Sequence, residues 1–172
     1  MVTHPWSDTK HVTREKLMEL LEYYPDSGLF VWKQRTSARV RAGSLAGVLD
    51  SKGYVIITYD RKPYKAHRLA WLYMTGEFPK QFIDHVNMVP ADNRWDNLRE
   101  ATRAESNVNR RSRNSTGFKG VRRTIHGKFV AQLNRKYLAT FDTPEEAYDA
   151  YSAAAKEQHG EFFNGVCRQR EE

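Results

Sequence analysis

Residues 83–109 have the sequence IDHVNMVPADNRWDNLREATRAESNVN, in which an aspartate and a histidine stand side by side. Asp84 and His85 end an apolar run that predicts a strand. A polar loop rich in amides follows, and a second short strand leads to Thr102. The residues from Thr102 to Glu105 form a capping-box pattern, which predicts the start of a short helix. The expected order is therefore strand, loop, strand and helix.

The residue types in this order suit a metal-assisted hydrolase of phosphodiesters. Asp84 can hold a divalent cation, His85 can take a proton from water, and amide side chains can fix the geometry. An isolated Asp-His pair is weak support, because such pairs also occur as cap and core residues. The neighbouring DNR and NLR triplets and the capping box make the pattern specific.

These residues resemble the HNH homing endonucleases encoded in phage genomes, whose motif has the form DH…DNR…NLR..T..EN..N. The preceding sequence YKAHRLAWLYMTGEFP resembles the same family, and the likeness covers about residues 13–110. The resemblance implies a ββα-metal nuclease fold in which Asp84 binds Mg²⁺, or Mn²⁺ in its place. It also implies that His85 is the general base and that Asn97 fixes the loop and the orientation of His85.

The third signature residue of that family, His or Asn, falls at Ser106 in this chain. A serine hydroxyl is a weaker neutral metal ligand than an amide oxygen or an imidazole. Asn107 is adjacent, but one step along a helix rotates a side chain by about 100°. Asn109 lies one turn further on the same face as Ser106. The last metal ligand is therefore Ser106, Asn107 or Asn109, and we expect weak activity with a high Mg²⁺ requirement.

The residues before this motif predict a small α+β unit. Thr13 can cap a helix whose apolar face comprises Leu17, Leu20, Leu21 and Tyr24. The following residues predict a turn at 25–28, a strand at 29–33 and an exposed basic loop at 35–41. After these we expect a hairpin of 54–59 with 63–66, and a helix at 67–75 that is closed by Gly76. In that helix Arg68 could bind a DNA phosphate. The alternative is that His67 and Arg68 brace the hairpin against the helix, which we favour for His67.

Residues 117–164 predict a second unit of three short strands and one helix. Thr143-Pro144-Glu145-Glu146 combines a cap, a proline in the first turn and a capping-box glutamate. The sequence FKGVRR…GKFVAQL…LATFDTPEEAYDAYSAAA…HGEFFN resembles the Apetala-type DNA-binding domain of plant ethylene-response factors. Phe129 and Ala139 replace the tryptophan and glycine usual in that domain. The resemblance implies a three-stranded antiparallel sheet packed on one helix, with the sheet in the DNA major groove.

Charge independently favours DNA as the partner of the second half. The formal net charge is +7, and no acidic residue lies between Glu105 and Asp142. Arginine suits guanine edges and glutamine suits adenine, whereas phosphate contacts set register and affinity. With Arg68, the predicted DNA-binding residues are Arg110, Arg111, Arg113, Lys119, Arg122, Arg123, Lys128, Gln132 and Arg135.

Length and composition limit the remaining choices. The 172 residues suit a nuclease domain at 1–109, a basic linker at 110–116, a DNA-binding domain at 117–164 and a tail at 165–172. Cys167 is the single cysteine, so neither an internal disulfide nor a cysteine-based structural zinc site is expected. No signal peptide or membrane span is expected. If the phage resemblance holds, the protein acts in the bacterial cytoplasm as a monomer or homodimer on DNA.

The sequence leaves three functions open, and only the first needs Asp84 and His85 as an active site. The first is a site-specific DNA endonuclease. The second is a sequence-specific DNA-binding regulator with a decayed nuclease site, which the serine at position 106 keeps open. The third, RNA binding, rests on charge alone, and the sheet lacks the exposed stacking aromatics that single-strand RNA readers use.

Overall fold

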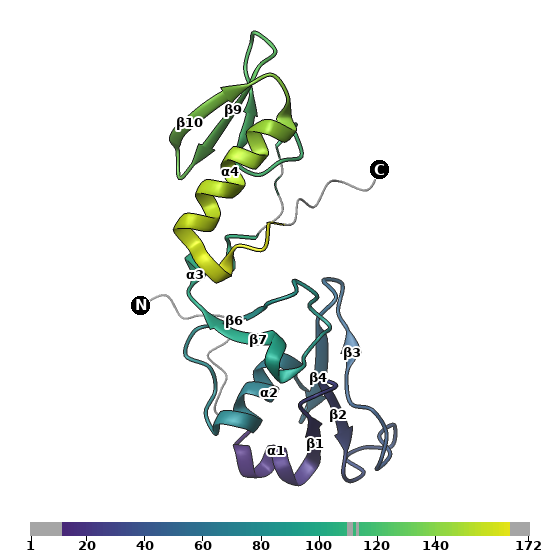
Figure 1. Ribbon diagram of the computed structural model, residues 1–172. Coiled ribbons are helices and arrows are strands. Elements are labelled where there is room, and N and C mark those ends of the chain that lie inside the picture. The colour runs from purple at the N-terminus through teal and green to yellow at the C-terminus, as the bar shows by residue number, and fades with distance from the viewer. Residues whose placement is uncertain (1–11, 110–111, 113, 166–172) are drawn as a thin grey trace, which may run out of the picture. The chain divides into compact units, whose positions relative to one another are not determined.

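The computed structural model describes residues 12–109, 112 and 114–165 (Figure 1). Contacts divide the chain into two compact units, Met1–Thr102 and Arg103–Glu172. Both mix helices with antiparallel strands, which confirms the α+β class expected from the sequence. Within the described ranges, no helix combines the length and the apolar character that crossing a membrane requires.

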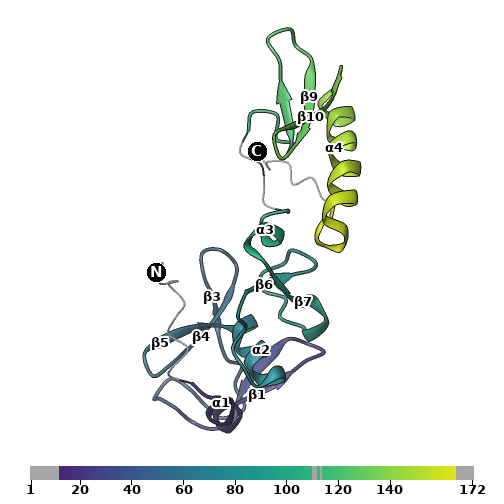
Figure 2. The same ribbon diagram turned by 90° about the vertical axis from the view of Figure 1, so that its left-hand side faces the viewer.

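Over residues 12–102, the described part of the first unit contains two α-helices, one 3-10 helix and three small antiparallel sheets. Its elements are α1 (Arg14–Leu20), β1 (Leu21–Tyr24), β2 (Leu29–Trp32), β3 (Val48–Leu49), β4 (Val55–Tyr59), β5 (Lys62–Lys65), α2 (Ala66–Thr75), β6 (Phe82–His85), the 3-10 helix η1 (Trp95–Asn97) and β7 (Leu98–Ala101). The sheets are β1-β2, β3-β4-β5 and β6-β7. Figure 2 shows the β3–β4 connection extending beyond the strands, away from α1. One apolar core, centred on Leu17, Ile57 and Leu69, unites these elements.

The predicted first helix is shorter than expected. Thr13 caps α1 as predicted, but the helix ends at Leu20 and the chain continues directly as β1. Leu21 and Tyr23 are buried, whereas Glu22 and Tyr24 are exposed, which is the alternation of a strand. Pairing of β1 with β2 therefore outweighs the helical spacing of the leucines.

The second unit is a three-stranded sheet covered by one long helix. Its elements are α3 (Arg103–Ser106), β8 (Val121–Arg123), β9 (Phe129–Leu133), β10 (Lys136–Phe141), α4 (Pro144–His159) and the 3-10 helix η2 (Gly160–Phe162). The strand order is β10-β9-β8, and α4 packs on the sheet (Figure 1). Small residues of α4, Ala147 and Ala155, are fully buried in this core. The capping box at Thr143 and Glu146 forms as predicted.

The residues before β8 are part of the second unit. Asn109 donates from Nδ2 to the carbonyl of Phe162 at 2.6 Å and accepts the backbone N–H of Asn164 at 3.0 Å. Lys119 donates from Nζ to the carbonyl oxygens of Asn107 and Val108. These bonds tie residues 107–109 to the domain that we placed at 117–164, whose exact limits stay a prediction.

Candidate functional site

The candidate catalytic pair lies at the end of β6. In the β6–β7 pair, Asp84 faces Arg99 and His85 faces Leu98. Arg99 donates to Asp84 Oδ2 from Nη2 at 2.9 Å and from Nε at 3.2 Å. Both side chains are largely buried, with exposed fractions of 18% for Asp84 and 16% for Arg99. Asp84, the residue that the sequence predicted as a metal ligand, is therefore paired with the guanidinium of Arg99.

The imidazole of His85 is buried and oriented by Asn93. His85 Nε2 lies 3.4 Å from Asn93 Oδ1, a long hydrogen bond. The amide of Asn93 is itself oriented, because Nδ2 donates to the carbonyl of Ala91 at 3.1 Å. An amide oxygen can only accept a hydrogen bond, so the proton of a neutral His85 belongs on Nε2. Nδ1 then carries the lone pair that a general base needs.

Burial keeps His85 neutral. Desolvation lowers the pKa of His85 below its usual value of 6.5, although Asn93 and the carboxylate of Asp84 act in the opposite direction. The rings of Tyr54 and His67 pack against His85, with centroid distances of 5.9 Å and 5.1 Å. His67 is buried as well, and burial lowers its pKa to about 3. We had favoured a structural role for His67, and these contacts agree with it.

Asn97 closes the polar loop between the two strands. Its Oδ1 accepts the N–H of Asn87 at 2.9 Å, and its Nδ2 donates to the carbonyl of Asp92 at 2.7 Å. Its own carbonyl accepts the N–H of Val86. Asn97 thus holds three backbone groups of the loop, and its catalytic role stays a prediction, whereas the side chain that lies within hydrogen-bonding distance of His85 Nε2 is that of Asn93. The DNR triplet contained this residue, but the sequence did not show that its side chain would face His85.

The N-terminal hairpin supports the backbone of Asn93. Tyr23 donates from its hydroxyl to the carbonyl of Asn93 at 2.7 Å, and the N–H of Trp95 donates to the carbonyl of Pro25 at 2.9 Å. Gly28 has a φ of +72°, and a Cβ there would lie 2.4 Å from the backbone N of Arg94. Only glycine permits this close approach. The hairpin β1–β2 is therefore a brace for the loop that orients His85.

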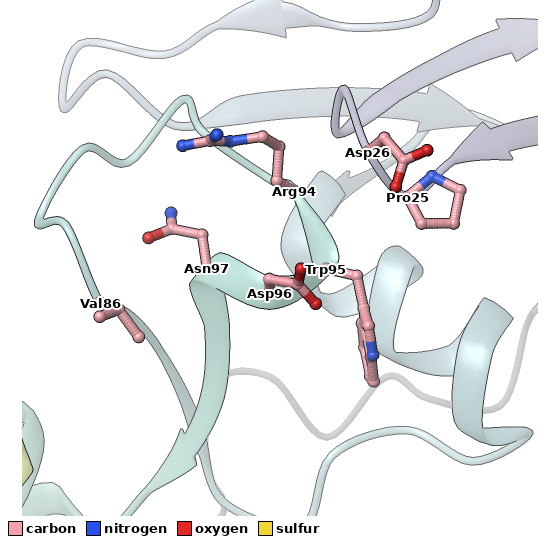
Figure 3. Close-up of a pocket in the computed structure, with 7 residues that line it drawn as sticks. All are labelled: Pro25, Asp26, Val86, Arg94, Trp95, Asp96 and Asn97. Atoms are coloured by element: carbon pink, nitrogen blue, oxygen red, sulfur yellow. The ribbon is translucent and has the colours of Figure 1, made fainter.

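A pocket of about 370 Å³ lies beside this brace (Figure 3). Its lining residues are Pro25, Asp26, Val86, Arg94, Trp95, Asp96 and Asn97. The guanidinium of Arg94 is committed to Asp92 at 2.7 Å. With Asp26 and Asp96 in the lining, the pocket does not suit a phosphate.

The three candidates for the last metal ligand belong to the second unit. Asn109 uses both ends of its amide to hold η2 and the residues after it. Asn107 donates from Nδ2 to the carbonyl of Arg103 at 2.7 Å. Ser106 is half-buried at the end of α3. The roles of all three as ligands stay predictions. Because the amide of Asn109 is already hydrogen-bonded at both ends, Ser106 and Asn107 are the better candidates for the last ligand. Among the described residues, no group of three or more His, Cys, Asp or Glu could hold a metal.

The sheet of the second unit has a face turned away from α4. Register pairs Arg122 with Val130 and Gln132 with Tyr137, and Thr140 also faces Val130. These residues alternate with Val121, Ala131 and Leu133, which pack against α4. Tyr137 is 61% exposed, and its hydroxyl lies 3.2 Å from Thr140 Oγ1. Tyr137 and Thr140 were not among the predicted DNA-binding residues, although their alternation with Leu138 and Phe141 is a signal that places them on this face.

The other predicted DNA-binding residues occupy varied positions. Arg123 faces Phe129 at the end of β8, Arg135 lies in the β9–β10 turn, and both are exposed. Lys128 forms an ion pair with Asp142. Lys119 is bound to backbone carbonyls, and Arg68 donates to the carbonyl of Pro79 at 3.4 Å. Arg110, Arg111 and Arg113 lie outside the described residues.

Comparison with known proteins supports both halves of the sequence analysis. Residues 64–108 match the HNH endonuclease family. An uncharacterized HNH endonuclease of Acanthamoeba polyphaga mimivirus is 28% identical over 120 residues, which cover 66% of this chain and 63% of that protein. An ethylene-responsive transcription factor of Arabidopsis thaliana is 36% identical over 85 residues, covering 46% of this chain and 25% of that protein.

A second plant protein shares a shorter segment. Dehydration-responsive element-binding protein 2A of Arabidopsis thaliana is 45% identical over 49 residues, which cover 25% of this chain and 15% of that protein. The chain thus spans less than two thirds of each of these relatives. No solved structure matches it. The chain therefore carries an HNH endonuclease domain at residues 64–108 together with a C-terminal region homologous to plant ethylene-responsive and dehydration-responsive transcription factors.

Proposed function

We propose that this chain is a site-specific DNA endonuclease of the homing type, which hydrolyses a DNA phosphodiester with one divalent metal ion and His85 as general base. One observation carries the proposal. His85 is buried next to Asp84, and Asn93 holds its Nε2, so that Nδ1 is left as the base. Such an arrangement suits proton abstraction from a water molecule at neutral pH.

The donor set fits a loosely held Mg²⁺. This ion takes one or two carboxylates and keeps several waters, so Asp84 with one neutral oxygen from Ser106 or Asn107 suffices. Asp84 Oδ1 accepts no hydrogen bond from any described residue, because both bonds from Arg99 end on Oδ2. Bound there, the metal would polarise the scissile phosphate and stabilise the leaving oxyanion. We propose the ββα-metal architecture for β6, β7 and α3 on this basis.

The residues of the chain divide the remaining work. His85 Nδ1 takes the proton of the attacking water, while Asn93 keeps the ring in place and in the required tautomer. Asn97 holds the loop, and Tyr54 and His67 exclude water from one side of the imidazole. Arg99 balances the charge of Asp84. In the second unit we propose that Arg122, Gln132, Tyr137 and Thr140 face bases in the major groove, while Arg123 and Arg135 contact phosphates.

A plasmid nicking assay with Mg²⁺ and with EDTA, beside a gel shift on duplex DNA, tests the proposal. Metal-dependent cutting by the native chain supports it. The variant His85→Ala should lower cutting by ~10²- to 10⁴-fold while duplex binding stays nearly intact. A gel shift without cutting at any metal concentration would select the regulator with a decayed site. Equal cutting by His85→Ala would remove His85 from the mechanism.

A further inference from the structure

Three large aliphatic side chains in the segment around β3 are exposed to solvent. The exposed fractions are 71% for Val48, 65% for Leu45 and 64% for Leu49. Val48 and Leu49 form β3, the short outer strand of the β3-β4-β5 sheet. Exposed aliphatic groups gathered on one segment commonly mark a surface that another molecule covers.

The segment that carries them is ordered. Ala46 is buried in the core of the first unit, and Val40 packs against that core. The N–H of Gly43 donates to the carbonyl of Trp32 at 2.7 Å, and the N–H of Ala46 donates to that of Phe30 at 2.8 Å. These bonds hold the backbone on both sides of Leu45, and pairing with β4 holds Val48 and Leu49, so the exposure of the three side chains belongs to the fold.

The charge of the same segment is uniformly positive. No acidic residue occurs from Gln34 to Leu49, while Arg35, Arg39 and Arg41 are exposed. The next acidic residue, Asp50, is paired with Lys65 at 3.1 Å. Arginines flanking exposed aliphatic side chains complement DNA, whose phosphates attract the arginines and whose minor groove accepts apolar side chains.

The segment leads to the candidate catalytic pair. Asp50 Oδ1 accepts the N–H groups of Lys52 and Tyr54, at 2.8 Å and 2.9 Å, and so shapes the turn after β3. The ring of Tyr54, the last residue of that turn, packs against His85. Leu49 pairs with Val55, the residue that follows Tyr54. The turn after β3 therefore ends at a residue that packs against His85.

We propose that residues 35–49 form a second DNA-contact surface, in which Val48 and Leu49 enter the minor groove of a duplex and Arg39 and Arg41 bind its phosphates. The inference rests on the proposed function in one respect, because both place DNA against the first unit. It adds a contact beside the scissile bond that is separate from the sheet of the second unit. An apolar insertion of this kind unstacks and bends the duplex locally.

Duplex binding by the full chain in EDTA, measured over a range of salt concentrations, tests the surface without any cleavage. The variant Arg39→Ala/Arg41→Ala should reduce the slope of log affinity against log salt by about 1.8, since each phosphate contact contributes about 0.9. The variant Val48→Ser/Leu49→Ser should weaken binding about tenfold with an unchanged slope. The matched control Arg61→Ala/Lys62→Ala, at the β4–β5 turn and the first residue of β5, should behave as the native chain.

The proposal requires both the smaller salt slope of the arginine variant and the weaker binding of the aliphatic variant. If either variant binds duplex DNA as the native chain does, the proposal is wrong. Native-like circular dichroism of each variant is the check on folding. Sedimentation without DNA gives a further test. If the native chain is a dimer and Val48→Ser/Leu49→Ser makes it a monomer, the surface binds a second copy of the chain and the proposal is wrong. Nicking assays with Mg²⁺ are read separately, so that a chain that binds as expected but never cuts would refute the nuclease alone.

Discussion

Asn93 joins the candidate base to the rest of the first unit. Its side chain contacts His85 and the carbonyl of Ala91, and its backbone carbonyl is held by Tyr23. The sequence predicted the catalytic candidates Asp84, His85 and Asn97 because they occupy fixed positions of a short motif. It did not predict the role of Asn93, which depends on how the loop folds back onto β6.

Substitution of Asn93 should alter the pH dependence of cutting. Asn93→Leu removes the acceptor at Nε2 and should lower the rate by ~10- to 100-fold with little effect on duplex binding. Asn93→Asp places a carboxylate there, which favours the imidazolium and raises the pKa of His85. The acidic limb of the rate profile should then move to higher pH. An unshifted limb in Asn93→Asp would show that Asn93 does not act through His85.

Ser106 is the residue at which this chain departs from the motif of the HNH endonucleases that it resembles. If Ser106 supplies the last metal ligand, Ser106→Asn should raise cutting at low Mg²⁺, and Mn²⁺ should partly rescue the native chain. Sequence preference should not change, because we propose that the second unit carries it. The measurement is nicking rate against metal concentration, with Asn107→Ala and Asn109→Ala as comparisons. If Ser106→Asn has the same dependence of nicking rate on metal concentration as the native chain, and both alanine variants are fully active, this metal site is wrong.

His67 should make the first unit sensitive to acid. Its imidazole is 7% exposed, its Nδ1 has no hydrogen-bond partner among the described residues, and burial lowers its pKa to about 3. Above pH 6.5 both the folded and unfolded states are neutral at this position. Below that value only the unfolded chain gains the proton, so stability should fall by ~1.4 kcal/mol per pH unit.

The role of His67 is tested by urea unfolding at pH 7 and at pH 5.5, with tryptophan fluorescence as the signal that monitors unfolding. All four tryptophans of the chain lie in the first unit, so this signal reports on that unit alone. His67→Phe should reduce the loss of stability between the two pH values. His126→Gln, which alters an exposed histidine in the second unit, should not. An equal loss in His67→Phe and the native chain would contradict the prediction.

At the scale of elements, most boundaries followed from local signals. The caps at Thr13, Gly76 and Thr143 place the helices where they occur, and two residues with positive φ, at 134 and 135, make the β9–β10 turn. The exception is β1, which continues from α1 without a break. Its strand conformation depends on pairing with β2, and helical spacing of leucines cannot show such a partner.

The hairpin β1–β2 can be tested through one glycine. Gly28→Ala should destabilise the first unit by ~1–3 kcal/mol and lower cutting, because a methyl group there meets the backbone of Asn93 and Arg94. Gly53→Ala is the matched control: φ is +80° there too, but a Cβ has no neighbour within 4 Å. Equal losses of tryptophan-monitored stability in the two variants would mean that backbone strain alone is responsible.

At the scale of the whole molecule, the two units should be separable. A fragment of residues 103–165 should fold alone and bind duplex DNA with an affinity that falls as salt rises. A fragment of residues 117–165 loses Asn109 and the carbonyls that Lys119 holds, so it should unfold at lower urea concentration. Tyrosine fluorescence and gel shifts measure both properties. Equal stability of the two fragments would restrict the domain to the predicted limits at 117–164.

The charge pair between Arg99 and Asp84 has a consequence for the order of events on DNA. A bare carboxylate beside a scissile phosphate would repel the substrate until a metal arrived, whereas a carboxylate already matched by a guanidinium does not. Under the proposed function, the chain should therefore dock on its target before the cation is present. Cutting should then be a triggered step, so that mixing a preformed complex with Mg²⁺ would start every molecule at the same moment.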